Sequence, residues 1–214
     1  MQLYFFERNL ERVVLKSKRK EGKIMLSDVE HEEKKQQILH DCFELFVQQG
    51  LENTSMNDLT NYCKTYKAAV YNYFKSKDEI VYEAAKMYMT ELREKIQKDM
   101  THQCESLSDR LKRGFLLLTS EKQQLRFVYQ VISSPKYGQR SREELYAVYM
   151  EYLNYSEYFA ECYNISHELF RPYYLLYVAT IHDFCLWENE ELVNEKLECI
   201  YDKVIQFEKN GTNK

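Results

Sequence analysis

The chain has 214 residues, a formal net charge of −4, and only five Gly and two Pro. So few helix-breaking residues predict an all-α protein, and the length allows a small domain followed by a larger one. The negative net charge excludes binding of nucleic acid through the overall charge, so any such contact requires a local basic surface.

Cysteine usage and hydropathy indicate the compartment. The six Cys residues form no Cys-x-x-Cys pair and show no metal-ligand spacing. We therefore expect buried thiols in a reducing cytoplasm, with no metal ion and no other cofactor. No apolar run reaches the roughly 18 residues that cross a membrane. Residues 1–24 also lack the apolar segment of a signal peptide.

The first 24 residues are unusually basic, with seven Lys or Arg and three Glu. They could form a basic amphipathic extension that contacts DNA. Alternatively, the start is over-extended and the native protein begins at Met25. Lys20-Glu21-Gly22 can be encoded by a purine-rich ribosome-binding sequence just upstream of Met25, so we favour the second interpretation. The nucleotide sequence would decide between them.

Residues 33–80 contain short amphipathic segments with almost no linker between them. Apolar residues at helical spacing predict a helix over Lys34–Gln49, after which Gly50 suits the positive φ of a helix end. A capping-box pattern, Ser55 with Asp58, opens a second helix over Met56–Cys63. A third helix is expected to start near Tyr66 or Lys67 and to run to Phe74. Two short helices braced by a longer one predict a helix-turn-helix motif.

This window resembles the N-terminal domain of TetR-type (TetR/AcrR) transcriptional regulators. The motifs that carry the resemblance are Ile38-Leu39, Leu45-Phe46, Gly50-Leu51, Thr54-Ser55-Met56 and the run Lys67–Ile80, KAAVYNYFKSKDEI. The resemblance implies a helix-turn-helix DNA-binding domain over residues 25–80. It also implies a larger helical domain over residues 81–214, which binds an effector and forms the dimer.

The third short helix is the candidate DNA-recognition element. Val70 and Phe74 are apolar and four residues apart, so they face inward and leave the outer face to Lys67, Ala68, Tyr71 and Asn72. The resemblance implies phosphate contacts for Thr54, Ser55, Tyr71 and Lys77. It implies an approach to the bases for Lys67, Ala68 and Asn72. The alternative is that Tyr71 and Tyr73 are core aromatic residues.

The turn before this helix departs from the family pattern, which has Gly, a small apolar residue and a Ser or Thr cap. Here the three positions hold Lys64, Thr65 and Tyr66. We expect strain at Lys64, which would need a positive φ, and we count Lys64 and Tyr66 among the candidate DNA contacts. Thr65 could replace Tyr66 as the helix cap.

The rest of the chain predicts longer helices. A helix from Lys77 to about residue 100 links the two halves, and Ser108 is expected to cap the next one. Further helices are expected over Leu111–Leu118, over Glu121–Ile132, from a Ser141 cap to about Tyr163, and from Pro172 to Trp187. Asn189 caps the last helix. The apolar surfaces of the last two helices predict a homodimer that joins them in a four-helix bundle.

Candidate effector-binding residues lie in these later helices. Tyr recurs every third residue from Tyr146 to Tyr158, and part of this series, Tyr149 and Tyr152, could line one wall of a pocket. His182 and Trp187 are further candidates. His182 and Cys185 are three residues apart, but no further ligands lie at helical spacing. We therefore interpret His182 as a polar group satisfied inside the fold rather than as a metal ligand.

Together these patterns predict a dimeric, ligand-responsive transcriptional repressor that binds a near-palindromic operator, with a small apolar or aromatic effector. The alternative is a helix-turn-helix activator, or a DNA-binding protein that is regulated by a protein partner and has no small-molecule ligand. An enzyme is not expected, because the chain has no phosphate-binding loop, nucleophile elbow or paired-carboxylate signature.

Overall fold

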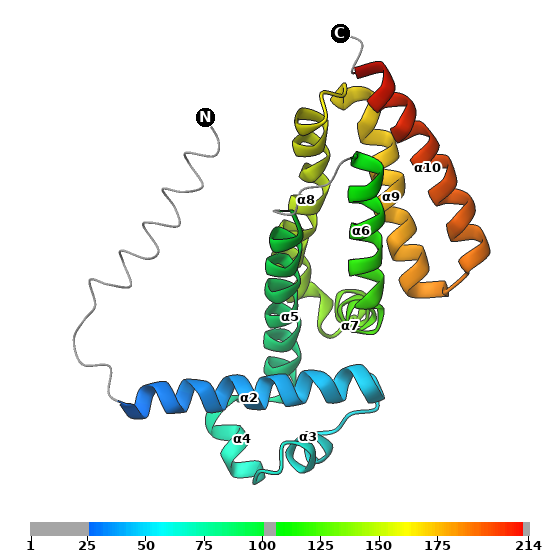
Figure 1. Cartoon of the computed structure of the whole chain (residues 1–214). Helices are drawn as coiled ribbons and strands as arrows, with labels where there is room; N and C mark the ends of the chain where they lie inside the picture. Colours follow the sequence, from blue (N-terminus) through cyan, green and yellow to red (C-terminus); the bar gives the residue numbers. More distant parts are fainter. Residues whose placement is uncertain (1–25, 101–105, 212–214) are drawn as a thin grey trace. The chain divides into compact units, whose positions relative to one another are not determined.

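The computed structural model describes residues 26–100 and 106–211, shown as ribbons in Figure 1. Within these ranges the chain forms nine helices and no strand, which confirms the all-α prediction. The helices are α2 (Leu26–Gln49), α3 (Met56–Tyr62), α4 (Lys67–Tyr73), α5 (Lys77–Met100), α6 (Leu107–Ser120), α7 (Lys122–Ser133), α8 (Gly138–Cys162), α9 (His167–Trp187) and α10 (Glu190–Gly211). None of these helices is long and apolar enough to span a membrane. The predicted basic extension, residues 1–24, lies outside the described residues.

The chain divides into two compact units, residues 1–38 and residues 39–214. In the first unit, the described part of α2 carries mostly exposed side chains, and Gln36 Nε2 donates a hydrogen bond of 2.7 Å to Glu32 Oε1. The second unit contains the rest of α2 and all the later helices. The contacts described below lie within the second unit.

The short helices α3 and α4 begin and end close to the predicted positions. Gly50 has φ +86° after the end of α2, as expected. Both bonds of the Ser55–Asp58 capping box are present, with Ser55 N 2.7 Å from Asp58 Oδ2 and Asp58 N 3.2 Å from Ser55 Oγ. Helix α4 begins at Lys67, as expected, and the alternative cap at Thr65 is wrong, because Tyr66 occupies the cap position without a side-chain bond. The bulky Tyr66 therefore leaves the first amides of α4 without a side-chain acceptor.

Helix α7 makes packing contacts on two of its faces within the second unit. On one face, the ring of Phe127 stacks on Phe46 of α2 with centroids 5.5 Å apart, and it meets Phe43 edge-on, also at 5.5 Å. Gln130 Oε1 accepts a hydrogen bond of 3.3 Å from Leu51 N, just after α2. The other face of α7 packs on α8 and α9. Helix α7 thus joins the helix-turn-helix segment to the later helices.

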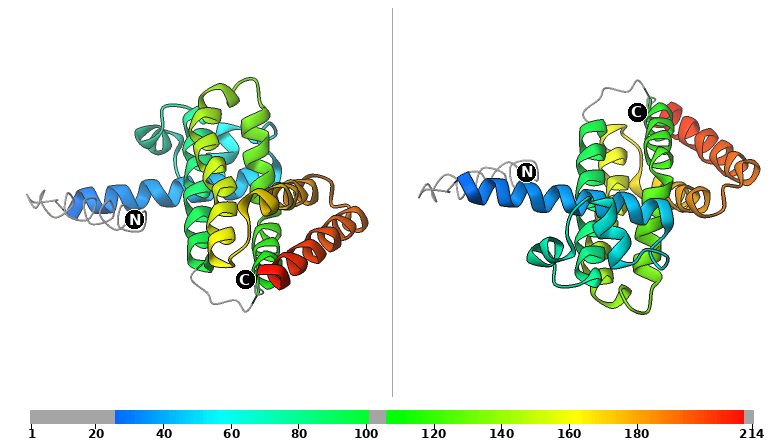
Figure 2. Two further views of the ribbon diagram at one scale, coloured as in Figure 1. Left: turned by 90° about the horizontal axis from the view of Figure 1, so that it is seen from above. Right: turned by 90° about the horizontal axis from the view of Figure 1, so that it is seen from below.

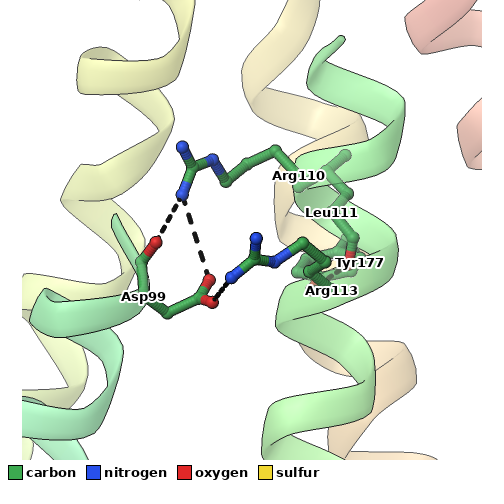
Figure 3. Close-up of polar contacts among 5 residues, drawn as sticks. All are labelled: Asp99, Arg110, Leu111, Arg113 and Tyr177. Carbon is green, nitrogen blue, oxygen red and sulfur yellow. Dashed lines mark hydrogen bonds and ion pairs between the residues drawn. The ribbon is translucent and has the colours of Figure 1, made fainter. Parts of the chain in front are cut away.

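A cluster of polar contacts joins the end of α5 and the middle of α9 to the first half of α6 (Figure 3). Arg110, which is largely buried, donates through Nη1 to the Asp99 carbonyl oxygen at 2.8 Å, and Arg113 pairs with the Asp99 carboxylate. The Tyr177 hydroxyl donates to the Leu111 carbonyl oxygen at 2.8 Å. Because the buried guanidinium of Arg110 has an acceptor on α5, the cluster fixes the position of α6 against α5 and α9.

Replacing Gly114 by Ala is expected to destabilise this junction by about 1–3 kcal/mol. A Cβ atom on Gly114 would lie 2.8 Å from the Tyr177 hydroxyl oxygen. Tyr177 cannot move away cheaply, because its ring is buried and its hydroxyl is bonded to Leu111. Urea unfolding would measure the loss. A change below about 0.5 kcal/mol would show that Tyr177 is not held in this position.

Three predicted helix starts are wrong. The cap of α6 is Ser106, whose Oγ accepts from Asp109 N at 3.0 Å, while Ser108 is buried inside the helix. Helix α8 starts at Gly138, so Ser141 also lies buried within a helix. Helix α9 starts at His167, which places Pro172 inside it. In each case hydrogen bonds that begin earlier in the chain extend the helix past the local signal. The Asn189 cap is confirmed, since its Oδ1 accepts from Leu192 N at 3.1 Å.

Helices α9 and α10 pack against each other at one side of the second unit (Figure 2). The apolar surface that the sequence predicts on these two helices is only partly covered within one chain. The inner face of α9 is buried, but several leucines remain exposed: Leu169, Leu175, Leu176 and Leu186, with Leu192 on α10.

The thiols also differ from expectation, because Cys162 and Cys199 are exposed. Cys42, Cys63 and Cys185 are buried as expected. Cys104 lies outside the described residues.

Candidate functional site

Helix α4 presents a polar face to solvent, anchored by two buried apolar residues. Val70 and Phe74 are 0% and 1% exposed, which confirms that they face inward. Tyr66 and Tyr71 are 86% and 43% exposed, so Tyr71 is not a core residue. The exposed candidates from the sequence are Ser55, Lys64, Tyr66, Lys67, Ala68, Tyr71 and Asn72. They lie on α4, in the turn before it and at the start of α3, and together with the exposed Lys75 we call them the α4 face.

Two candidate DNA contacts, Thr54 and Lys77, are instead engaged within the protein. Thr54 is 1% exposed, and its hydroxyl donates to the Gly50 carbonyl oxygen at 2.8 Å. Lys77 Nζ donates to the Leu51 carbonyl oxygen at 2.8 Å and lies 6.0 Å from the centre of the Phe46 ring. Burial lowers the pKa of Lys77 below its usual value. Both side chains therefore hold the loop between α2 and α3 in place, and we leave them out of the proposed contact set.

The sequence analysis missed Lys75, which is exposed directly after α4. Its backbone amide donates to Glu79 Oε2 at 2.6 Å, which fixes the chain at this corner. Its place between two predicted helices could have indicated it, because Lys side chains commonly contact phosphates.

Replacing Lys64 by Gly is expected to raise the free energy of unfolding by about 1 kcal/mol. Lys64 has φ +48°, a conformation that Gly adopts without strain. The same change removes an exposed charge beside α4, so we expect weaker DNA binding together with higher stability. Chemical denaturation and DNA titration measure the two effects separately. Lys64→Ala is the control, since it removes the charge but keeps the strain.

A cavity of about 590 Å³ lies among α5, α6, α7, α8 and α9. This volume is in the usual range for small-molecule sites. The side chains that line it are mostly apolar or aromatic: Met89, Leu92, Leu118, Leu125, Val128, Tyr129, Ile132, Arg142, Glu143, Leu145, Tyr146, Tyr149, Tyr152, Tyr174, Tyr177, Val178, Ile181 and His182. Below we call this the central cavity.

The structure brings three of the four effector candidates together. Tyr149, Tyr152 and His182 line the central cavity. Trp187 does not: it ends α9 with 77% of its surface exposed, because the helix carries it beyond the cavity. The sequence analysis missed Tyr129 and Arg142, whose positions depend on how α7 and α8 pack and not on any local motif.

His182 lies between two aromatic rings in the wall of the central cavity. Its ring centre is 5.4 Å from that of Tyr129 and 5.8 Å from that of Tyr149. Burial lowers the pKa of His182 below its usual value, so the imidazole is neutral at pH 7. Among the described residues, no three His, Cys, Asp or Glu side chains gather as they would around a metal ion. The arrangement is suited to binding an organic molecule.

Comparison with known families identifies the helix-turn-helix segment. Residues 38–84 match the sequence model of the family described as "Bacterial regulatory proteins, tetR family". Residues 38–84 form a TetR-type helix-turn-helix domain. No curated protein sequence matches the chain. The TetR-type assignment confirms the resemblance drawn from the motifs around Gly50 and Phe74.

Solved structures extend the TetR-type fold to the later helices. A protein from Mesorhizobium loti assigned to the TetR family is 14% identical, with 83% of this chain and 96% of that chain covered and a TM-score of 0.61. A TetR-family regulator from Streptomyces coelicolor is 14% identical, with coverage of 81% and 96% and a TM-score of 0.59. The fatty acid degradation regulator FadR from Bacillus halodurans is 15% identical, with coverage of 78% and 94% and a TM-score of 0.58. The chain therefore has the fold of TetR-family transcription regulators.

Proposed function

We propose that this protein is a ligand-responsive transcriptional repressor that acts in the cytoplasm and binds a near-palindromic operator as a homodimer. The central cavity is the main support for this proposal, because α7 both lines the cavity and packs on the TetR-type domain. Helix α7 lines the cavity through Val128 and Tyr129 and contacts α2 through Phe127. In this proposal, residues 25–80 bind DNA, and residues 81–214 bind the ligand and form the dimer.

The α4 face supports the DNA-binding part of the proposal. Lys64, Lys67 and Lys75 offer charges to phosphates, while Ala68 and Asn72 can approach base edges in the major groove. Two copies in a symmetric dimer would bind half-sites about 34–36 Å apart, or farther apart if the two domains are splayed.

The exposed leucines of α9 and α10 support the dimer. In the single chain, the apolar side chains of Leu176 and Leu186 on α9 and of Leu192 on α10 are exposed. Joining two copies along these helices would bury them in a four-helix bundle.

The cavity supports regulation by a ligand. A domain that responded only to a protein partner would be packed solid in its centre, whereas the central cavity measures about 590 Å³. A ligand there shifts the protein toward one arrangement of α5 and α7 only if it binds that arrangement more tightly. Through Phe127 and Gln130 such a shift would reach the TetR-type domain and change the spacing of the two α4 faces. Because FadR is named for fatty acid degradation, acyl compounds belong in the ligand screen.

The test is selection of DNA from a random library with the full-length protein, followed by binding measurements on the enriched sequence. We expect an enriched inverted repeat, one dimer per site, and a changed preference in Asn72→Ala. A small-molecule library would then be screened for compounds that raise the melting temperature and release the DNA. The absence of any enriched sequence would contradict the DNA-binding proposal. Enrichment without any stabilising compound would instead favour regulation by a protein partner.

A further inference from the structure

Six tyrosines line the central cavity, and their hydroxyl groups fall into different classes. Tyr174 donates to the carbonyl oxygen of Tyr152 at 2.8 Å, and Tyr177 donates to that of Leu111 at 2.8 Å. These two hydroxyls are therefore already bonded to the backbone of the protein. The hydroxyls of Tyr129 and Tyr152 are buried and have no hydrogen-bond partner within the described part of the chain. A hydroxyl donor that is buried without an acceptor is unfavourable. A hydrogen-bond acceptor placed beside these two hydroxyls would therefore stabilise them.

The two unpartnered hydroxyls belong to tyrosines that line the same cavity. Burial is the main cause that raises the pKa of Tyr129 above its usual value. Burial likewise raises the pKa of Tyr152, so both groups keep their protons at pH 7. Two protonated phenols therefore offer two donors to the cavity. An oxygen with two lone pairs can accept from both.

The remaining polar side chains of the wall carry no net formal charge. Arg142 is the only Lys or Arg among the lining residues, and its Nε donates to the Gly138 carbonyl oxygen at 3.0 Å. Glu143 follows it in the same wall, so the lining carries one formal charge of each sign. His182 is neutral. A carboxylate in the cavity would lose its hydration without meeting a net positive charge, which is unfavourable. A neutral ligand avoids this cost.

We infer that the ligand is an uncharged, largely apolar molecule with a carbonyl-type oxygen that accepts hydrogen bonds from Tyr129 and Tyr152. Its hydrocarbon part contacts the aliphatic and aromatic wall, including Val128, Val178 and Ile181. The acceptor selects among apolar molecules of similar size, because one that lacks it leaves both hydroxyls unpaired. This inference rests on the proposed function, since it names the ligand class of the same cavity.

The test compares three probes of nearly equal shape by calorimetric titration into the full-length protein: 2-acetylnaphthalene, 2-isopropenylnaphthalene and 2-naphthoate. The first has a neutral acceptor oxygen, the second has none, and the third is a carboxylate. We expect the ketone to bind about tenfold or more tightly than the alkene, as one or two hydrogen bonds would provide. We expect the carboxylate to bind more weakly than the ketone.

Variants that lack one hydroxyl group show which tyrosine causes the preference for the ketone. Tyr129→Phe and Tyr152→Phe, singly and together, should reduce the ketone-to-alkene ratio, to near one in the double variant. Their melting temperatures should stay unchanged or rise, because each removes an unpaired buried hydroxyl. Tyr174→Phe is the matched control: it loses a bonded hydroxyl from the same wall, so it should be less stable and keep the ratio.

The outcomes separate this inference from the proposed function. Equal binding of ketone and alkene, tighter binding of the carboxylate, binding of neither neutral probe, or an unchanged ratio in the double variant would each overturn the inference. Ketone selectivity that depends on the two hydroxyls would support it even if the protein selected no DNA sequence, in which case only the proposed function would fail. Ligand-dependent release of DNA without the selectivity would leave the function standing and contradict the inference.

Discussion

Replacing Phe127 by Ala is expected to lower the free energy of unfolding by about 3–5 kcal/mol. The ring is 1% exposed and contacts both Phe43 and Phe46, so its removal leaves a void between α7 and α2. For a protein of this size the loss corresponds to a drop in melting temperature of roughly 6–20 °C. Differential scanning calorimetry would measure it.

Phe127→Leu is the matched control for this prediction. It keeps an apolar side chain and loses the aromatic contacts, so it should cost clearly less than the alanine variant. If Phe127→Ala costs less than about 1 kcal/mol, the stack between α7 and α2 does not contribute to stability as described. The route that we propose from the cavity to the TetR-type domain would then lose its basis.

Replacing both Lys64 and Lys67 by Gln is expected to weaken DNA binding on the order of 10³-fold at 0.15 M salt. The reason is that each proposed phosphate contact releases counterions, and a dimer would lose four contacts. The slope of log K against log salt should fall in magnitude by about 3.6, at about 0.9 per contact. Lys64 and Lys67 are exposed and form no salt bridge with any carboxylate of residues 26–100 and 106–211. Lys67 Nζ donates a weak hydrogen bond of 3.5 Å to Asn57 Oδ1.

The control removes two charges elsewhere, Lys112→Gln with Lys209→Gln. It has the same net charge as the test variant but leaves the α4 face intact. Its salt slope should match that of the unchanged protein. Equal slopes in the test variant and the unchanged protein would mean that α4 does not face the phosphate backbone.

Local signals predicted the TetR-type domain well, because its geometry is decided within a few residues. Gly50 and the Ser55–Asp58 capping box are determined by neighbouring backbone groups, and both are present in the structure. The ends of α5, Lys77 and Met100, also agree with the prediction. The motif match left the direction of each side chain open, however. Thr54 and Lys77 turn inward because carbonyl groups of the loop between α2 and α3 lie within their reach.

The later helices were harder to predict, because the same local pattern occurs at helix starts and inside helices. Ser141 with Glu144 has the spacing of a capping box, but Ser141 is buried in the first turns of α8. The central cavity has no local signal at all. Tyr129 and Tyr152 come from different helices, and only the packing of α7 against α8 brings both into one wall.

The two faces of α7 have a consequence for protein engineering. If a TetR-type domain were exchanged between regulators as residues 38–84 alone, it would pack on an α7 that lacks the ring of Phe127 and the amide of Gln130. A functional chimera therefore requires that these two side chains be transferred with the domain. The practical boundary for such exchanges is a surface shared by distant segments and not a single position in the sequence.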